Sequence, residues 1–252
     1  MGILLKSFIF LFAVLQGYPV LGIFSSCNLL RCNSPAVRDQ LQAMNWVPTT
    51  EEHLQTLCPP VLRSLRCLGE EVKICINMDV NQLATSENKT LNIIGNLFLN
   101  VGQFATEICS NETDLRRNYL ASVSCFKDLY EDPEPQMKCH RDGDAIYSLY
   151  ARSLDLLGEV QNEVREGEIS ERFCMVSAYV LACFTANLQD RCGNVARATF
   201  VDILRRFHYL KWKECPDIDL INLKTKFLNF LELEEGKKDI YSEVFNSQRR
   251  RK

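Results

Sequence analysis

The side chains with the most potential for chemistry in this chain are its twelve cysteines. An even number of cysteines in an oxidising compartment predicts disulfide bonds. A structural zinc site would need two close ligand pairs, and only Cys27 and Cys32 lie close enough to form one. A cysteine nucleophile would need a free thiol, and complete pairing leaves none. We therefore expect six disulfides and no metal site, built from Cys27, Cys32, Cys58, Cys67, Cys75, Cys109, Cys125, Cys139, Cys174, Cys183, Cys192 and Cys215.

The spacing of the cysteines repeats once along the chain. A set of five occurs twice, and Cys27 and Cys125 remain outside both sets. Such regularity predicts an internal duplication, with a chance alignment of a frequent residue as the alternative. The two sets are Cys32, Cys58, Cys67, Cys75 and Cys109, then Cys139, Cys174, Cys183, Cys192 and Cys215.

Each set contains three closely spaced cysteines. In the second set these are Cys174, Cys183 and Cys192, and each lies nine positions after the one before. On a helix, residues nine apart are half a turn out of phase and about 13 Å apart along the axis. A disulfide requires Cα atoms about 4.4–6.8 Å apart, so neighbours in the triplet do not bond to each other. A helix with such a triplet must be joined to different partners on opposite sides, which predicts the central helix of a bundle.

Apolar residues recur every three or four positions through most of the chain, and alternating strand patterns are absent. The sequence therefore predicts an all-α fold, a disulfide-stapled bundle of about eight helices. Pro59-Pro60 suits the first turn of one helix, and Gly193 suits the end of another. The predicted helical segments are 59–78, 91–108, 115–130, 146–164, 173–188, 195–210, 220–231 and 240–245.

The polar stretch Glu131–Gln136 is the best candidate for a linker, because it contains two prolines and falls between the two cysteine sets. Two separate domains and one packed bundle both fit this division, since Leu120–Tyr130 could dock on either side. The predicted organisation is a signal peptide at 1–22, a first cysteine-rich helical half at 23–130, a second at 131–215, and a helical C-terminal extension with a basic tail at 216–252.

The first residues have the layout of a secretory signal peptide. Lys6 precedes an apolar stretch from Phe8 to Leu15, and the small Gly22 follows. The stretch is well short of the roughly 20 residues that span a bilayer, so we expect cleavage after Gly22, with an uncleaved anchor as the alternative. No later segment has the length or freedom from charge of a membrane helix, so the sequence predicts a secreted protein.

The net charge of −3 gives no basic field that would gather nucleic acid. Only the tail Arg249–Lys252 is strongly basic. We interpret this tail as a solvated terminus, with binding to heparan-like polyanions or trimming by a basic-residue protease as alternatives.

Two triplets predict N-glycosylation, Asn88-Lys89-Thr90 and Asn111-Glu112-Thr113. Neither has proline in the middle, and both lie in polar stretches typical of a loop or a helix start. Secretion would expose both to glycosyl transfer, so we expect glycans on Asn88 and Asn111.

Sequence signatures of the common secreted hydrolases are missing. The chain has no Gly-x-Ser-x-Gly elbow, no His-Glu-x-x-His and no glycine-rich phosphate loop. His140, with Asp142 and Asp144 nearby, is the closest approach to a reactive cluster, and we interpret it as a solvated loop after a disulfide. The same segment lacks the remaining ligands of a calcium loop. We therefore expect no enzyme activity, no cofactor and no bound metal.

The cysteine frame can be followed with its neighbouring residues from Cys58 to Cys215. It consists of Cys58, Cys67 and Cys75; Cys109, followed by Tyr119-Leu120 and Cys125-Phe126; Cys139; Cys174, Cys183 and Cys192; and Cys215, preceded by Ile203-Leu204-Arg205-Arg206-Phe207. This frame resembles the insect twenty-seven-kilodalton haemolymph glycoprotein family, secreted cysteine-rich proteins of arthropod body fluid. The resemblance implies a soluble extracellular protein and supplies no active site to carry over. The helical extension and basic tail beyond Cys215 depart from the pattern and put in doubt any role inferred from members that end near that cysteine.

The sequence thus predicts a secreted, non-enzymatic glycoprotein of haemolymph or another body fluid that acts by binding. A small lipophilic ligand is the first candidate, because a disulfide-stapled bundle can keep an apolar cavity open. A venom, salivary or defence effector that binds a protein target is the alternative, and an enzyme of unrecognised type is the third. The expected partner is an extracellular ligand or protein, with no nucleic acid and no membrane span.

Overall fold

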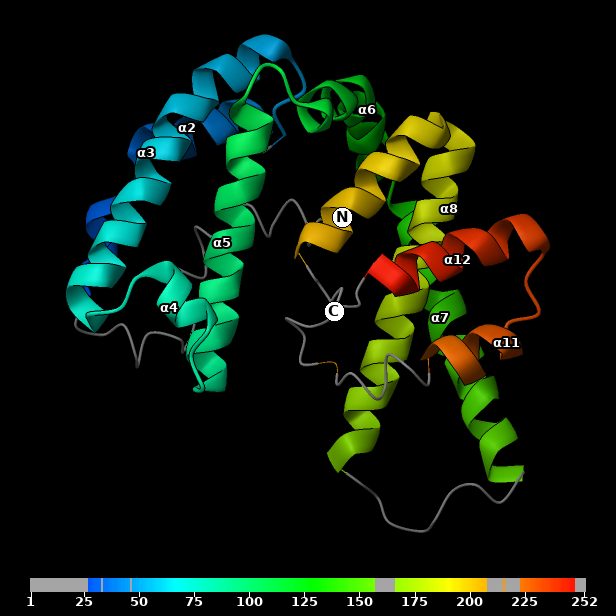
Figure 1. Ribbon diagram of the computed structural model, residues 1–252. Coiled ribbons are helices and arrows are strands. Elements are labelled where there is room, and N and C mark those ends of the chain that lie inside the picture. The colour runs from blue at the N-terminus through cyan, green and yellow to red at the C-terminus, as the bar shows by residue number, and fades with distance from the viewer. Residues whose placement is uncertain are drawn as a thin grey trace. The chain divides into compact units, whose positions relative to one another are not determined.

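The computed structural model describes residues 27–32, 34–45, 47–156, 166–207, 215 and 223–247. Within them every regular element is a helix, and the predicted disulfide-stapled all-α fold is confirmed (Figure 1). The chain divides into two compact units, Met1–Lys127 and Asp128–Lys252. The predicted signal peptide and the basic tail lie outside the described residues.

The first unit is built on two long helices, α3 and α5, which pack against each other. The short η2 and α2 pack on α3, while α4 packs on α5 (Figure 1). Helix α6 begins in this unit, and its last residues are counted with the second. The elements are η2 (Leu29–Cys32), α2 (Pro35–Ala43), α3 (Glu51–Ile76), α4 (Val80–Ala84), α5 (Lys89–Cys109) and α6 (Asp114–Glu131).

Polar side chains begin three of these helices by accepting hydrogen bonds from backbone amides that have no partner within the helix. Thr50 accepts from the amide of His53 before α3. Asp79 before α4 forms a capping box with Gln82. The Asp79 carboxylate accepts from the amide of Gln82, and the amide of Asp79 donates to the Gln82 side chain. Asn88 accepts two amide hydrogen bonds at the start of α5.

The predicted start of α3 at Pro59-Pro60 is wrong, because the helix already begins at Glu51. Proline inside a helix removes an amide donor and is unfavourable. Here the additional turns bury Leu54 and Leu57, which offsets that cost. The cap at Thr50 fixes the earlier start.

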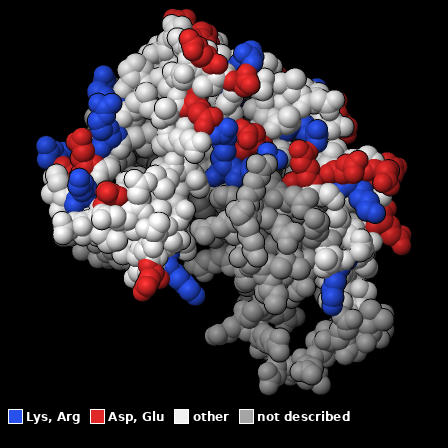
Figure 2. Space-filling model, viewed as in Figure 1, with Lys and Arg blue, Asp and Glu red and all other residues white. Residues whose placement is uncertain are grey.

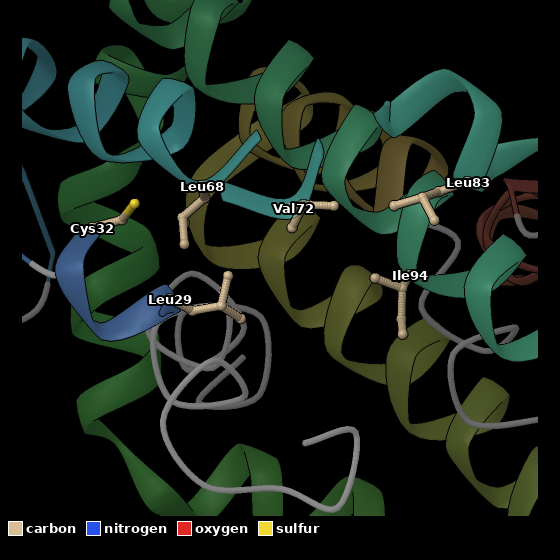
Figure 3. Packing of buried hydrophobic residues seen from close by; sticks show 6 residues of the cluster. All are labelled: Leu29, Cys32, Leu68, Val72, Leu83 and Ile94. Carbon is tan, nitrogen blue, oxygen red and sulfur yellow. The ribbon is translucent and has the colours of Figure 1, made fainter. Parts of the chain in front are cut away.

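Among the described residues, two clusters of buried apolar side chains belong to the core of the first unit. The first joins η2, α3, α4 and α5, and Figure 3 shows its buried members, with Leu29 pointing toward Leu68 while Leu83 and Ile94 lie beside Val72. The second joins α2, the first half of α3 and the end of α5, and consists of Val37, Leu41, Leu57, Val61 and Ala105. Helices α3 and α5 contribute to both clusters, but only α3 packs against η2, α2, α4 and α5 among the described elements, so it is the central helix of this unit.

Helix α4 lies very close to α5 at Gly95. A Cβ atom on Gly95 would be 2.2 Å from the backbone nitrogen of Ala84. The Ala84 carbonyl at the end of α4 accepts hydrogen bonds from the amide groups of Asn92 and Asn96, at 2.6 and 3.1 Å. Both residues lie on α5, so glycine allows the approach and two asparagines satisfy the carbonyl that the approach buries.

The second unit is built on α8, against which α7 and α12 both pack. At Gly193 the backbone has φ 80°, so the helical conformation is interrupted there and then resumes, close to the predicted helix end. Helix α12 comes from the predicted C-terminal extension and is part of this unit. The elements are α7 (Pro133–Leu156), α8 (Glu166–Phe207), η3 (Leu223–Phe227), α11 (Leu228–Phe230) and α12 (Glu235–Ser247).

The predicted linker Glu131–Gln136 is almost entirely helical in the structure. Glu131 ends α6, Pro133 begins α7, and only Asp132 lies between them. Proline suits the first helical position, and the Asp132 carboxylate accepts a hydrogen bond from the amide of Glu134 at 3.2 Å. The same residues that looked like a linker therefore start a helix.

Replacing Gly95 by alanine should destabilise the protein by about 1–3 kcal/mol, because the added methyl group would overlap the backbone of α4. Gly102 on the same helix is the matched control, since beyond the adjoining backbone of α5 itself no atom of the protein's described part lies within 4 Å of the position that an added methyl group would take. Gly102→Ala should instead stabilise α5 by about 0.5–1 kcal/mol. Urea unfolding of both variants tests this, and equal effects would contradict the close packing of α4 on α5.

Candidate functional site

Disulfide bonds join α3 to other elements on both of its sides. All twelve cysteines are disulfide-bonded and none is free. Two bonds from the second half of α3 reach the segment 27–32, and the third joins its first half to the end of α5. These bonds are Cys75–Cys27, Cys67–Cys32 and Cys58–Cys109, with Cα atoms 5.4, 5.5 and 5.4 Å apart.

The second unit repeats this pattern on α8. Cys183 bonds to Cys139 on α7, and Cys174 bonds to Cys215, with Cα distances of 5.8 and 5.6 Å. In each five-cysteine set the first member therefore bonds to the third, and the second bonds to the fifth. Equivalent pairing in the two sets favours duplication over chance alignment.

A buried arginine, Arg116, joins three helices at one end of the first unit. Its guanidinium makes two hydrogen bonds to the Glu51 carboxylate, at 2.6 and 3.3 Å, and a third to the carbonyl of Ile108 at 2.6 Å. Arg116 is only 3% exposed. Glu51 begins α3 and Ile108 lies in the last turn of α5, so a single side chain on α6 links the ends of two other helices.

The electrostatic effect of this contact falls on Glu51. Hydrogen bonds from Arg116 and, second, from Gln55 lower the pKa of the Glu51 carboxyl below its ordinary value of 4.5. The carboxylate is therefore ionised at neutral pH. We did not predict this ion pair from the sequence, because its members are 65 positions apart.

The three residues considered as a reactive cluster lie on α7, so the predicted loop is wrong. His140 is exposed, Asp144 pairs with Arg172 at 2.9 Å, and Asp142 is half-buried. Residues two apart on a helix point in different directions, so Asp142 does not share a face with the other two. The helix persists here because Gly143 is buried against Tyr179, whose ring would lie 3.0 Å from an added Cβ atom.

Two buried tyrosines lie where α8 meets α12. The rings of Tyr179 and Tyr241 are 5.5 Å apart in a T-shaped arrangement. Burial raises the pKa of both phenols above its ordinary value of 10.0. These groups therefore remain neutral at physiological pH and serve packing.

The predicted glycosylation sites lie at the two ends of α5. Asn88 is the exposed residue that caps its start, and Asn111 lies exposed in the turn that follows its end. Among the described residues, no three acidic, histidine or cysteine side chains are grouped to hold a metal ion. Over the same ranges, no helix is both long and apolar enough to cross a membrane.

Comparison with known proteins gave no relatives: no family model, no curated protein and no solved structure matches this chain. The resemblance of its cysteine frame to haemolymph glycoproteins therefore stays a prediction.

Arg116→Ala should destabilise the protein by about 2–3 kcal/mol, because the Ile108 carbonyl loses its donor and α6 loses its bond to Glu51. The neighbouring Arg117 is the control, since it is 70% exposed and its ion-pair partner among the described residues is Asp114 on its own helix. Arg117→Ala should change the free energy of unfolding by less than about 0.5 kcal/mol. Chemical denaturation at neutral pH measures both.

Acid titration gives an independent check on the Arg116–Glu51 pair. A carboxyl whose pKa is lowered by folding stabilises the protein above its ordinary pKa, and this contribution is lost as the pH falls through the folded value. Glu51→Gln should therefore be less stable than the native protein at pH 7 and should approach it below pH 4.5. A difference that stays constant down to acid pH would argue against the pair.

Proposed function

We propose that the protein is secreted and acts in an extracellular fluid by binding. The observation that carries this proposal is the complete disulfide pairing of its twelve cysteines. Such pairing persists in oxidising compartments and is rare in the cytosol. The cysteine frame that resembles haemolymph glycoproteins supports a body fluid as the setting.

The arrangement of the polar residues supports a non-catalytic role. His140 and Asp144 are exposed on α7, and Asp144 is already paired with Arg172. Among the described residues the most strongly buried charge, Arg116, is bonded to Glu51 and to a backbone carbonyl. Asp144 and Arg116 are therefore engaged in structural contacts, and neither is positioned as an acid, base or nucleophile.

A small lipophilic molecule is the ligand that the first unit supports best. Half-buried apolar residues surround the cluster of Leu29, Leu68 and Val72, among them Ile76, Met78, Leu91 and Phe98. Two disulfides hold the N-terminal segment against this cluster, and each destabilises the unfolded chain by about 2–4 kcal/mol. A ligand could therefore contact apolar side chains without collapse of the surrounding helices.

A protein-directed effector, such as a venom, salivary or defence component, is the second candidate. It is favoured by Ile74, which is 76% exposed on α3 between Lys73 and a disulfide-bonded cysteine. A large exposed apolar side chain beside a positive charge resembles an anchor in a protein interface. Expression confined to a venom or salivary gland would favour this role over the carrier.

Purified native protein should bind a fluorescent fatty acid, and Met78→Ser should weaken binding about fivefold to tenfold by removing an apolar contact. Met137→Ser is the matched control, since Met137 is 49% exposed on α7 in the other unit. Fluorescence titration measures both affinities. Absence of probe binding, together with no apolar molecule in mass spectra of gently purified protein, would remove the carrier proposal.

A further inference from the structure

Helix α5 contains no charged residue between Lys89 and Glu107. Ile93 and Leu99 are 43% and 38% exposed on this stretch. In Figure 2 the visible surface over α4 and the middle of α5 is white, with charged side chains gathered toward the ends of α5. This helix therefore presents an uncharged, partly apolar surface without the charged side chains that usually keep such a surface hydrated.

Both glycosylation triplets flank this helix. Asn88 immediately precedes Lys89, and Asn111 lies two residues after Cys109. A helix of 21 residues is about 30 Å long, so the two asparagines lie at opposite ends of the uncharged stretch. Both asparagines are exposed.

The amide of Asn88 has separate atoms available for the helix and for a sugar. Its Oδ1 accepts hydrogen bonds from the amides of Thr90 and Leu91, at 3.0 and 3.2 Å. Its Nδ2 makes no hydrogen bond to any described residue, and this is the atom that an N-linked glycan modifies. Glycosylation would therefore leave the cap of α5 in place.

The second triplet is arranged differently. The Asn111 side chain has no hydrogen bond to the described residues, whereas the Thr113 hydroxyl donates to the Glu107 carbonyl at 2.6 Å and accepts from the Arg116 amide at 3.2 Å. Thr113 therefore begins α6 in the folded protein, in addition to completing the triplet. Asn111 is the position at which the glycan can be removed without loss of a cap.

We infer that Asn88 and Asn111 carry N-linked oligosaccharides, and that this pair of glycans keeps the uncharged surface of α5 soluble. The inference rests on the proposed secretion. The donor is an oligosaccharide linked through diphosphate to a membrane lipid. The bond between the sugar C1 and the diphosphate oxygen breaks, a bond forms between C1 and Nδ2, and Nδ2 releases one proton to a base while the lipid diphosphate leaves.

The test uses the full chain expressed in a eukaryotic secretory cell line, with intact mass measured before and after enzymatic removal of N-glycans. Native protein should carry two glycans. Thr90→Ala destroys the first triplet but retains Asn88 and its cap, and Asn111→Gln destroys the second, so each should carry one. Thr106→Ala, another exposed threonine of α5, is the control and should carry two.

The double variant Thr90→Ala with Asn111→Gln should unfold at the same urea concentration as native protein, because both helix caps remain. Its solubility should be at least about twofold lower than that of the native protein, since glycans solubilise the surface that they cover. Solubility is measured as the protein concentration at which light scattering begins to increase. Unmodified protein in the medium, or a double variant as soluble as the native protein, would overturn this inference alone. Unmodified protein found only inside the cell would overturn the proposed secretion as well.

Discussion

The structure depends on one geometric constraint: cysteines eight or nine residues apart on a helix lie about 12–13 Å apart along its axis and cannot bond to each other. Helix α3 satisfies it by bonding Cys67 and Cys75 to the N-terminal segment and Cys58 to the end of α5. Helix α8 satisfies it through α7 and Cys215. Each unit thus has a central helix joined by disulfides to more than one partner, and in the first unit the two apolar clusters pack around that helix.

Within the first unit, noncovalent contacts complete what the disulfides begin. Near one end of α5, Gly95 and two asparagines allow α4 to approach closely and satisfy its last carbonyl. At the other end, Arg116 joins α3, α5 and α6 close to the Cys58–Cys109 bond. A binding surface on such a unit is pre-organised, and a pre-organised surface loses less entropy when a ligand binds.

The sequence predicted the elements that depend on local pattern and missed contacts between distant residues. The bounds of α5 and α6 agree with the predicted 91–108 and 115–130 to within a few residues, because their apolar spacing is regular and polar caps precede them. The start of α3 was missed because Pro59-Pro60 is a strong local signal that buried leucines override. His140 was placed in a loop because the packing of Gly143 on Tyr179 is a tertiary contact. The Arg116–Glu51 pair, 65 positions apart, leaves no local pattern at all.

A peptide map of the native protein, digested without reduction, tests the central claim most directly. The account predicts the linked pairs Cys27–Cys75, Cys32–Cys67 and Cys58–Cys109 in the first unit, with Cys139–Cys183 and Cys174–Cys215 in the second, and no alkylated free cysteine. Several free thiols, or a bond between two cysteines of the same triplet, would contradict it, since neither fits a central helix joined on both sides.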